Sequence, residues 1–385
     1  MNGGSLLQRL SSGPVRVCGL VAGGLGLVVA LTAAVPPAGP WHGAAPPRKT
    51  PTALPNFLAS VSAVSASDAW AVGNDTGLAL HWNGTHWVRT SVPHPSVLNG
   101  VSALSASDAW AVGARGLVRT TTLALHWNGS AWTRVPTPSP GKFADLMGVS
   151  AASPADAWAV GVMPTLALHW NGTAWTQAAI PHPAGRFLLG VSTLSASDAW
   201  AVGSDTAGNT SKTLVLHWNG TAWAQVASPN VNGNGALLGV AALSPTDAWA
   251  VGNYTAGNDI KTLVLHWNGT AWVHVPTPSP GRSPLDDSLS GVSVLSASDA
   301  WAVGAFGHGH SQFSPKNTLV LHWNGSRWTQ VPAPNPRGVG TSPFTVLASV
   351  SARTPSDAWA VGCACSNDAD TTLVLHWNGT AWKRS

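Results

Sequence analysis

The sequence contains no glutamate, and it has a single tyrosine, Tyr254. All 15 acidic residues are therefore aspartates. Glycosidase and sialidase sites that depend on Glu, or on a Tyr assisted by Glu, cannot be built from this chain. The tyrosine count also excludes a copper-radical oxidase site that needs two tyrosines. Of the enzyme classes considered, only hydrolase or lyase chemistry based on Asp or on a metal stays open.

Charged residues are scarce, at 9% of the chain, and no stretch is strongly basic. The formal net charge of +4 comes from Arg9, Arg16, Arg48 and Lys49, because 15 basic residues balance 15 acidic residues from Pro51 onward. A nucleic-acid partner normally requires a concentrated basic surface that displaces counterions. We therefore expect no nucleic-acid partner.

The N-terminal segment lacks acidic residues and is largely apolar. Residues 1–16 carry two arginines, and an apolar run follows from Val17 to Val35. This pattern predicts a signal peptide over residues 1–34, with an uncleaved membrane anchor as the alternative. Residues 35–56 are rich in Pro and Ala and predict an extended linker. Both alternatives place residues 57–385 outside the cytoplasm, either secreted or at the cell surface, with membrane contact only if the leader is not cleaved.

One short stretch, L-V-L-H-W-N-G-T-A-W at Leu263–Trp272, occurs seven times with small changes. Each copy contains an Asn-Gly pair between an apolar run and a tryptophan. Such a pair is typical of a two-residue hairpin in a type I′ turn, which requires positive φ at both central residues. The sequence therefore predicts seven hairpins, with turns that begin at Asn83, Asn128, Asn171, Asn219, Asn268, Asn324 and Asn378.

A second motif, D-A-W-A-V-G, precedes every hairpin. In the unit that begins near Leu188, the predicted strands are G-V-S-T-L-S, A-W-A-V-G, T-L-V-L-H-W and A-W-A-Q-V. Four antiparallel strands that recur about every 47 residues are what a propeller blade requires. The prediction is an all-β chain that forms a seven-bladed β-propeller of four-stranded antiparallel blades. If every blade begins with its own first strand, no strand from one end of the chain completes the blade at the other end and so closes the ring. A shifted blade boundary would supply such a closing strand.

Tryptophan is abundant, and 21 of the 22 residues fall in the repeats, three to a unit. One buried Trp side chain removes roughly 150–250 Å² from water, a gross gain of ~4–6 kcal/mol against an extended chain. We expect these side chains to hold neighbouring blades together. The alternative is that one tryptophan of each unit stacks on a sugar.

These motifs resemble the kelch repeat in their order. An apolar strand is followed by D-A-W-A-V-G, by an aromatic-ended strand, by a turn and by a Trp near V-P. The resemblance covers Phe57–Ser385 and implies a propeller. Kelch units carry a double Gly and a Tyr where this chain has Gly203 and His217-Trp218. Many propellers with D-A-W-A-V-G-like units are secreted bacterial proteins of unknown role, and the resemblance implies the same for this chain.

Each repeat also carries one Asp and one His, as at Asp198 and His217. A catalytic pair would be needed once in one pocket, whereas these residues occur in every unit. We therefore expect structural roles. Each Asp should accept backbone N–H bonds in the first turn, and each His should lie on a strand, where it can bond to a neighbouring Asp.

Variation in length is confined to two kinds of connection. From the motif Asp to the hairpin His the separations are 13, 18, 13, 19, 19, 23 and 19 residues, whereas the two turns of each unit are nearly constant. In antiparallel blades the variable connections lie on one face, which is where repeat proteins usually bind partners. Candidate binding residues on the longest of these loops are Asp286, Asp287, Phe306, Asp368 and Asp370.

The same loops contain metal-ligand residue types. His308, His310, Cys363 and Cys365 come from neighbouring units, which suggests a zinc or copper site. A short-range disulfide or two free thiols are the alternatives for the cysteines. Asp368 and Asp370 could hold calcium, but a solvated loop is the favoured interpretation. The main expectation is that the protein has no cofactor.

Taken together, these patterns favour a secreted or surface-exposed, non-catalytic binding or scaffold module that uses the variable face. The expected partner is an extracellular protein or a cell-surface glycan. A glycan-binding propeller is the first alternative, and a metal-dependent or Asp-based hydrolase or lyase is the second.

Overall fold

The computed structural model describes residues 57–74, 77–93, 96–116, 119–182, 184–206, 210–282, 286–307, 316–336, 344–365 and 371–385. The predicted signal peptide and linker, residues 1–56, lie outside these ranges. Within them, no helical segment has the length and hydropathy of a bilayer span.

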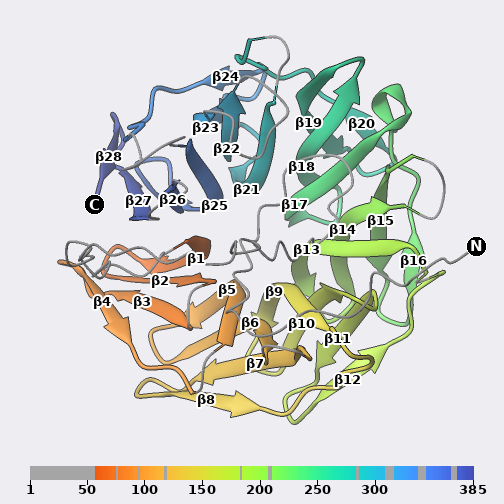
Figure 1. Ribbon diagram of the computed structural model, residues 1–385, viewed down its shortest axis with the longest axis vertical. Helices are drawn as coiled ribbons and strands as arrows, with labels where there is room; N and C mark the ends of the chain where they lie inside the picture. The colour runs from red at the N-terminus through yellow and green to blue at the C-terminus, as the bar shows by residue number, and fades with distance from the viewer. Residues whose placement is uncertain are drawn as a thin grey trace, which may run out of the picture.

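The described chain forms seven four-stranded antiparallel sheets arranged as a ring (Figure 1), which confirms the predicted seven-bladed propeller. Each blade is one continuous stretch of chain, with its strands paired in sequence order from the ring axis to the rim. The strands of blades 1 to 4 are β1 (Leu58–Ser65), β2 (Asp68–Gly73), β3 (Leu78–Trp82), β4 (Trp87–Thr90), β5 (Ser96–Ser105), β6 (Asp108–Arg115), β7 (Thr121–Trp127), β8 (Trp132–Val135), β9 (Asp145–Ser153), β10 (Asp156–Val162), β11 (Leu166–Trp170), β12 (Trp175–Ala178), β13 (Arg186–Ser195), β14 (Asp198–Asp205), β15 (Lys212–Trp218) and β16 (Trp223–Gln225).

The remaining three blades follow the same pattern. Their strands are β17 (Gly235–Ser244), β18 (Asp247–Ala256), β19 (Asp259–Trp267), β20 (Trp272–His274), β21 (Ser288–Ser296), β22 (Asp299–Gly307), β23 (Lys316–Trp323), β24 (Trp328–Gln330), β25 (Phe344–Thr354), β26 (Asp357–Cys365), β27 (Thr371–Trp377) and β28 (Trp382–Arg384). A short 3₁₀ turn, η1 (Val231–Gly233), precedes β17.

The D-A-W-A-V-G motif forms the second strand of each blade, and this strand is packed on both faces by neighbouring blades. In β2 every residue from Asp68 to Gly73 is buried. The final glycine has no room for a side chain, because a Cβ atom at Gly73 would lie 2.0 Å from the carbonyl oxygen of Phe57. The same close approach recurs at the corresponding glycine of each blade, which explains why the motif always ends in Gly.

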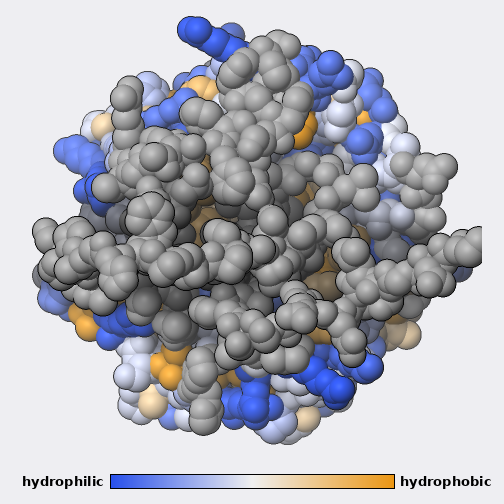
Figure 2. Space-filling model, viewed as in Figure 1, coloured by the Kyte–Doolittle hydropathy of each residue, from blue (hydrophilic) through white to orange (hydrophobic). Residues whose placement is uncertain are grey.

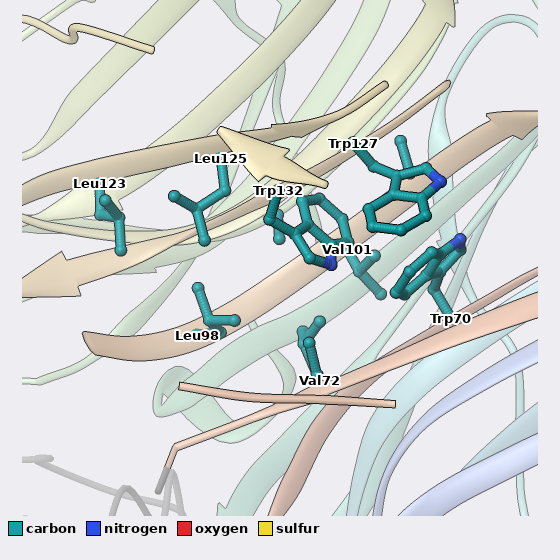
Figure 3. Close-up of a cluster of buried hydrophobic side chains, with 11 residues drawn as sticks. Trp70, Val72, Leu98, Val101, Leu123, Leu125, Trp127 and Trp132 are labelled. Atoms are coloured by element: carbon teal, nitrogen blue, oxygen red, sulfur yellow. The ribbon is translucent and has the colours of Figure 1, made fainter. Parts of the chain in front are cut away.

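Tryptophans fill the interfaces between blades, as predicted. Figure 3 shows Trp70 and Val72 of blade 1 pointing toward the side chains of blade 2. The ring of Trp70 lies 4.8 Å from that of Trp127 and 4.9 Å from that of Trp132, the latter in a T-shaped contact. On its own blade Trp70 stacks on His81, with ring centroids 4.4 Å apart.

Fourteen indole nitrogens, those of the first and third tryptophan of each blade, are buried without a hydrogen-bond acceptor. These are the residues that form the T-shaped pairs between blades, such as Trp200 with Trp272. In this geometry the edge of one indole meets the face of the other, which lets an N–H group approach a π system. The tryptophan layer of each interface therefore depends on aromatic contact rather than on conventional hydrogen bonds.

In the described chain the ring closes without a strand shared between blades 7 and 1. Strand β25 of blade 7 lies beside β1 of blade 1, and Trp359 contacts Trp82 and Trp87 across this interface. No strand of the described chain pairs with strands of another blade to complete its sheet. The observed blade boundaries are therefore the simplest predicted ones, in which no strand is shared across the closing interface.

Serine side chains link the innermost strands of adjacent blades around the axis. The hydroxyl oxygen of Ser62 in blade 1 accepts the backbone N–H of Ala103 in blade 2 at 3.0 Å. In the same way the hydroxyl oxygen of Ser351 in blade 7 accepts the backbone N–H of Ala63 in blade 1. The equivalent bond is made at six of the seven interfaces. Blade 5 has Ala241 at this position and supplies no hydroxyl to blade 6.

Candidate functional site

One face of the ring carries the two constant turns of every blade, and we call it the uniform face. In blade 1 the turns lie side by side, because the indole N–H of Trp82 donates to the carbonyl oxygen of Ala66 at 3.0 Å. The same bond recurs in all seven blades. The opposite face, which carries the connections between second and third strands and between blades, is called the loop face.

The Asn-Gly turns differ from the prediction. Trp82 pairs with Trp87, so the loop contains four residues, Asn83–His86, rather than two. Gly84 has a φ of 92°, but Asn83 does not have a positive φ. The predicted type I′ turn is therefore wrong.

The asparagine instead acts through its side chain. Its Oδ1 accepts the backbone N–H groups of Thr85 and His86, both at 3.0 Å, and the Thr85 hydroxyl at 2.8 Å. Such a side-chain acceptor replaces a backbone turn and does not require positive φ. The Ser or Thr that follows each Asn-Gly pair is thus part of the turn.

The Asp and His of each repeat form a pair at the uniform face, as expected for a structural role. In blade 4, His217 Nε2 lies 2.9 Å from Asp198 Oδ1, and the imidazole packs on Trp200. All seven blades contain this pair. The expectation that each Asp accepts backbone N–H groups is wrong, since Oδ2 of Asp68 and of Asp156 is buried with no hydrogen-bond partner. Each His is paired across the strands with the motif Trp, as His217 is with Trp200, and its ring reaches diagonally to the Asp two residues before that Trp.

The loop-face half of the ring contains a cavity of about 300 Å³ on the axis. All seven innermost strands begin at the loop face and end at the uniform face, and the lining residues come from the first half of each strand. Ser60, Gly148 and Ser349 are examples. Asn74 and Lys316, from the loop-face ends of the second and third strands, complete the wall.

Glycines bring the innermost strands close together around this cavity. A Cβ atom on Gly190 would lie 3.2 Å from the Cα atom of Gly239, and one on Gly291 would lie 2.9 Å from the Cα atom of Ser349. The wall is therefore made partly of exposed backbone, with hydrogen-bonding groups near the axis. Every blade contributes to it, yet the side chains differ from blade to blade.

The most polar part of the wall lies at blade 6. Lys316 Nζ lies 2.9 Å from Asp286 Oδ2, and the two side chains are 3% and 6% exposed. Asp287 is fully buried and accepts the backbone N–H groups of Gly281 and Gly307 at 3.0 and 3.1 Å. Desolvation raises the pKa of Asp287 above its ordinary value, against the lowering effect of these two bonds.

This arrangement changes how two predicted binding residues should be interpreted. Asp286 and Asp287 are not solvated side chains at a loop tip but are buried between blades 5 and 6. Asp286 also forms an isolated parallel bridge with Ile260 of blade 5. Their direct role is to hold Lys316 and the adjoining loops in place beside the cavity.

A second polar contact lies at blades 2 and 3. The amide nitrogen of Asn99, a cavity-lining residue, donates to Asp145 Oδ1 at 2.9 Å and to the Leu146 carbonyl oxygen at 2.8 Å. Burial raises the pKa of Asp145 to about 7, although the Asn99 bond acts in the opposite direction. This carboxyl group therefore retains its proton to a much higher pH than an ordinary aspartate does.

Phe306 lines a separate hollow of about 370 Å³ on blade 6. The hollow is bounded by β23 and by the segment after β24, including Asn317, Val331 and Pro332. Phe306 packs against the hydrophobic core between blades 5 and 6. Its predicted binding role stays a prediction.

The metal-site hypothesis is not decided. Cys363 and Cys365 are joined in a disulfide, which was one of the alternatives, and both are buried. His308, His310, Asp368 and Asp370 lie outside the described residues. Among the residues that the structure does describe, no group of three or more His, Cys, Asp or Glu side chains is placed to hold a metal.

Sequence reasoning missed Lys316, Ser288 and Asn99 as cavity-lining residues. One signal was available, because these positions differ among the repeats. Asn99, for example, corresponds to Leu189 in blade 4 and to Ser290 in blade 6. Departures from the repeat at the start of the innermost strand thus mark the cavity wall.

Comparison with known proteins identifies the fold and no family. No protein-family model matches the chain, and no curated protein matches it either. The chain is similar to the structure titled YCF48 bound to D1 peptide, with a TM-score of 0.51, 14% identity, and coverage of 84% of this chain and 93% of that one. It is also similar to YCF48 from Cyanidioschyzon merolae, with a TM-score of 0.55, 16% identity, and coverage of 84% and 96%. At this identity the similarity supports the propeller fold, and the kelch resemblance stays an expectation.

Proposed function

We propose that this protein is a non-catalytic binding module that holds a protein partner through an extended peptide segment at the axial cavity of the loop face. The observation that carries the proposal is the cavity of about 300 Å³, whose wall comes from the innermost strands of all seven blades. Its wall combines backbone groups, small polar side chains and apolar side chains such as Leu189 and Leu238. A peptide offers matching backbone donors and acceptors.

The chemistry of the wall supports binding over catalysis. Among the described lining residues there is no Asp, His or Cys side chain, and the one lysine, Lys316, is paired with Asp286. A serine hydroxyl such as that of Ser290 therefore has no histidine or carboxylate base beside it within the lining. The repeated Asp–His pairs belong to the uniform face and are engaged with tryptophan. A hydrolase or lyase at this cavity is therefore the weaker proposal.

One of the similar structures holds a peptide, as its title states. That observation concerns a different protein at low identity, and it supports a peptide as the class of ligand only by analogy. The proposed location is outside the cytoplasm. The leader-like N-terminus and the disulfide Cys363–Cys365 support this location, since disulfides persist in oxidising compartments.

The glycan-binding alternative has less support. The first tryptophan of every blade is at most 2% exposed, and six of the seven third tryptophans are 3 to 4% exposed. These rings are covered by the neighbouring blade and offer no face to a sugar. Partial exposure remains at Trp87 and at the second tryptophan of each blade, except Trp127 at 9%.

The proposal is tested by selecting random peptides on the purified protein and measuring their affinity for two variants. Ala59→Leu with Ala348→Leu fills the cavity, and leucine occupies the equivalent positions, Leu189 and Leu238, in two other blades. The matched control is Ala63→Val, farther along β1, where blade 6 carries Val294.

We expect selected peptides to bind the control normally and the filled variant at least about tenfold more weakly. A glycan array provides the parallel test of the alternative. Peptides that bind both variants equally, or a failure to select any peptide, would contradict the cavity as the binding site.

A further inference from the structure

The axial cavity has one ionisable side chain in its described lining, Lys316. Its side chain is 3% exposed, and its ammonium group lies 2.9 Å from Asp286 Oδ2. A lysine that is buried at a cavity wall retains hydrogen-bonding capacity, because an ammonium group has three N–H donors and Asp286 Oδ2 takes one of them. The remaining donors are available to a ligand that enters the cavity.

Ser288 provides a second donor on the same part of the wall. Its Oγ accepts the side-chain amide of Asn253 at 3.0 Å, and Asn253 is itself buried. Because the hydroxyl oxygen already accepts this bond, its own proton is free to be donated elsewhere. Ser288 lines the cavity together with Lys316 and Ser290. Donors therefore converge on one side of the cavity.

The charge balance limits the kind of anion that fits. Asp286 compensates the charge of Lys316, and Asp287 lies next in the chain with its carboxylate held by two backbone N–H groups. A phosphate dianion would meet only one cation, which is already paired. A carboxylate carries a single charge and needs two or three donors, which this wall can supply.

We propose that the axial cavity binds a single carboxylate group of the peptide, with hydrogen bonds donated by Lys316 Nζ and Ser288 Oγ. This inference rests on the proposed function and specifies the chemical group that anchors the ligand. The carboxylate can come from the C-terminus of the peptide or from an acidic side chain, and the two sources are separated by the choice of probe.

Three short probes are used: acetyl-Ala-Ala-Ala with a free C-terminal carboxylate, the same peptide as its C-terminal amide, and acetyl-Ala-Asp-Ala as an amide. Binding to the full chain is followed by nuclear magnetic resonance of the peptide. We expect the free-carboxylate probe to bind at least about tenfold more tightly than the first amide. Binding of the Asp probe alone would identify a side-chain carboxylate as the source.

The protein variants test the two donors. Removing Lys316 alone leaves Asp286 buried without its partner, which destabilises the fold. The pair is therefore replaced together as Lys316→Met with Asp286→Leu, and Ser288→Ala is made with the ion pair intact. The matched control is Lys212→Met, an exposed lysine at the start of the third strand in blade 4. Thermal melting verifies that each variant is folded.

We expect at least tenfold weaker carboxylate binding in the double variant, several-fold weaker binding in Ser288→Ala and no change in Lys212→Met. Equal binding of acid and amide probes, or full binding by the double variant, would overturn the proposal. If selected library peptides still lose affinity when the cavity is filled, the proposed function stands and only the carboxylate anchor fails. If no probe binds and filling the cavity has no effect, both fail.

Discussion

The two faces of the ring differ in how far their contacts repeat. On the uniform face every blade repeats the same bonds, such as Trp82 to Ala66 and His81 to Asp68 in blade 1. On the loop face some polar contacts recur in only part of the blades and others occur once among the described residues. Lys316–Asp286 in blade 6 has no counterpart in blade 4, which has Arg186–Asp205 instead. A contact that recurs in all seven blades serves the fold. A contact that occurs once is where a specific ligand can be recognised.

The largest expected effect is loss of a tryptophan from the repeated interfaces. Trp359→Ala should destabilise the protein by about 3–5 kcal/mol, since the ring is buried between blades 7 and 1. Trp200→Ala, at an interface inside the chain, should cost the same if all seven interfaces are equivalent. Chemical denaturation measures both, with the exposed Val88→Ala as control. A much smaller cost at Trp359 would show that the closing interface is weaker than the others.

Glycines separate the repeated positions from the variable loops next. Gly203→Ala should cost about 3 kcal/mol, because the new Cβ atom would lie 1.8 Å from the Phe187 carbonyl oxygen. Gly257→Ala on the loop face has φ +63° but nothing within 4 Å, so only backbone strain of ~1 kcal/mol is expected. Denaturation midpoints distinguish them. Equal losses would mean that the close approach at Gly203 is relieved at little cost.

Asp145 gives the loop-face half of the ring a pH dependence. Its pKa is raised in the folded protein to about 7, whereas the ordinary value is 3.8, so the folded state binds the proton more tightly. Stability should therefore fall as pH rises through this window, by about 2 kcal/mol between pH 5 and 7 from this group. Asp145→Asn should flatten that part of the profile. An identical profile for the variant would contradict the assignment.

The turn asparagines should contribute less. Asn268→Ala removes the acceptor of two backbone N–H groups and of the Thr270 hydroxyl, an expected loss of ~1 kcal/mol. Asn268→Asp retains an acceptor and should recover most of that loss. Thermal unfolding of the pair tests the side-chain role. Equal stability of the Ala and Asp variants would favour a purely backbone turn.

The smallest expected effect concerns the serine links around the axis. Ala241→Ser would supply the hydroxyl that blade 5 lacks and should stabilise the protein by about 0.5–1 kcal/mol. Ser351→Ala removes such a link at the closing interface and should cost a similar amount. Calorimetric melting detects both. A destabilising Ala241→Ser would show that the interface between blades 5 and 6 is spaced differently.

The repeated part of the structure could be predicted from the sequence because its signals were local. The strand pattern, the tryptophan interfaces and the Asp–His pairs follow from motifs that recur seven times. The turn at Asn83 was misjudged because Asn-Gly is compatible with two loop lengths, and the choice depends on the side-chain bonds of Asn83. The D-A-W aspartates were expected to accept backbone N–H groups because the sequence does not show the strand register that brings each His close to its Asp.

The loop-face contacts could not be predicted in the same way. Lys316 and Asp286 are 30 positions apart and lie in segments that differ in length between repeats, so no periodicity relates them. Whether Asp287 is solvated or buried depends on the backbone N–H groups of Gly281 and Gly307, which only the folded chain brings near. Such residues are found from coordinates, or from the positions where one repeat departs from the rest.

Because each blade is a single uninterrupted segment, the gene could have gained or lost whole repeats without changing the strand pairing within the other blades. A duplicated segment would arrive with its own tryptophans and with both halves of a new interface. Its inner strand and its loops would then be free to diverge, since neighbouring copies preserve the ring. Propellers of this type are thus suited to acquiring new ligands by altering one blade at a time.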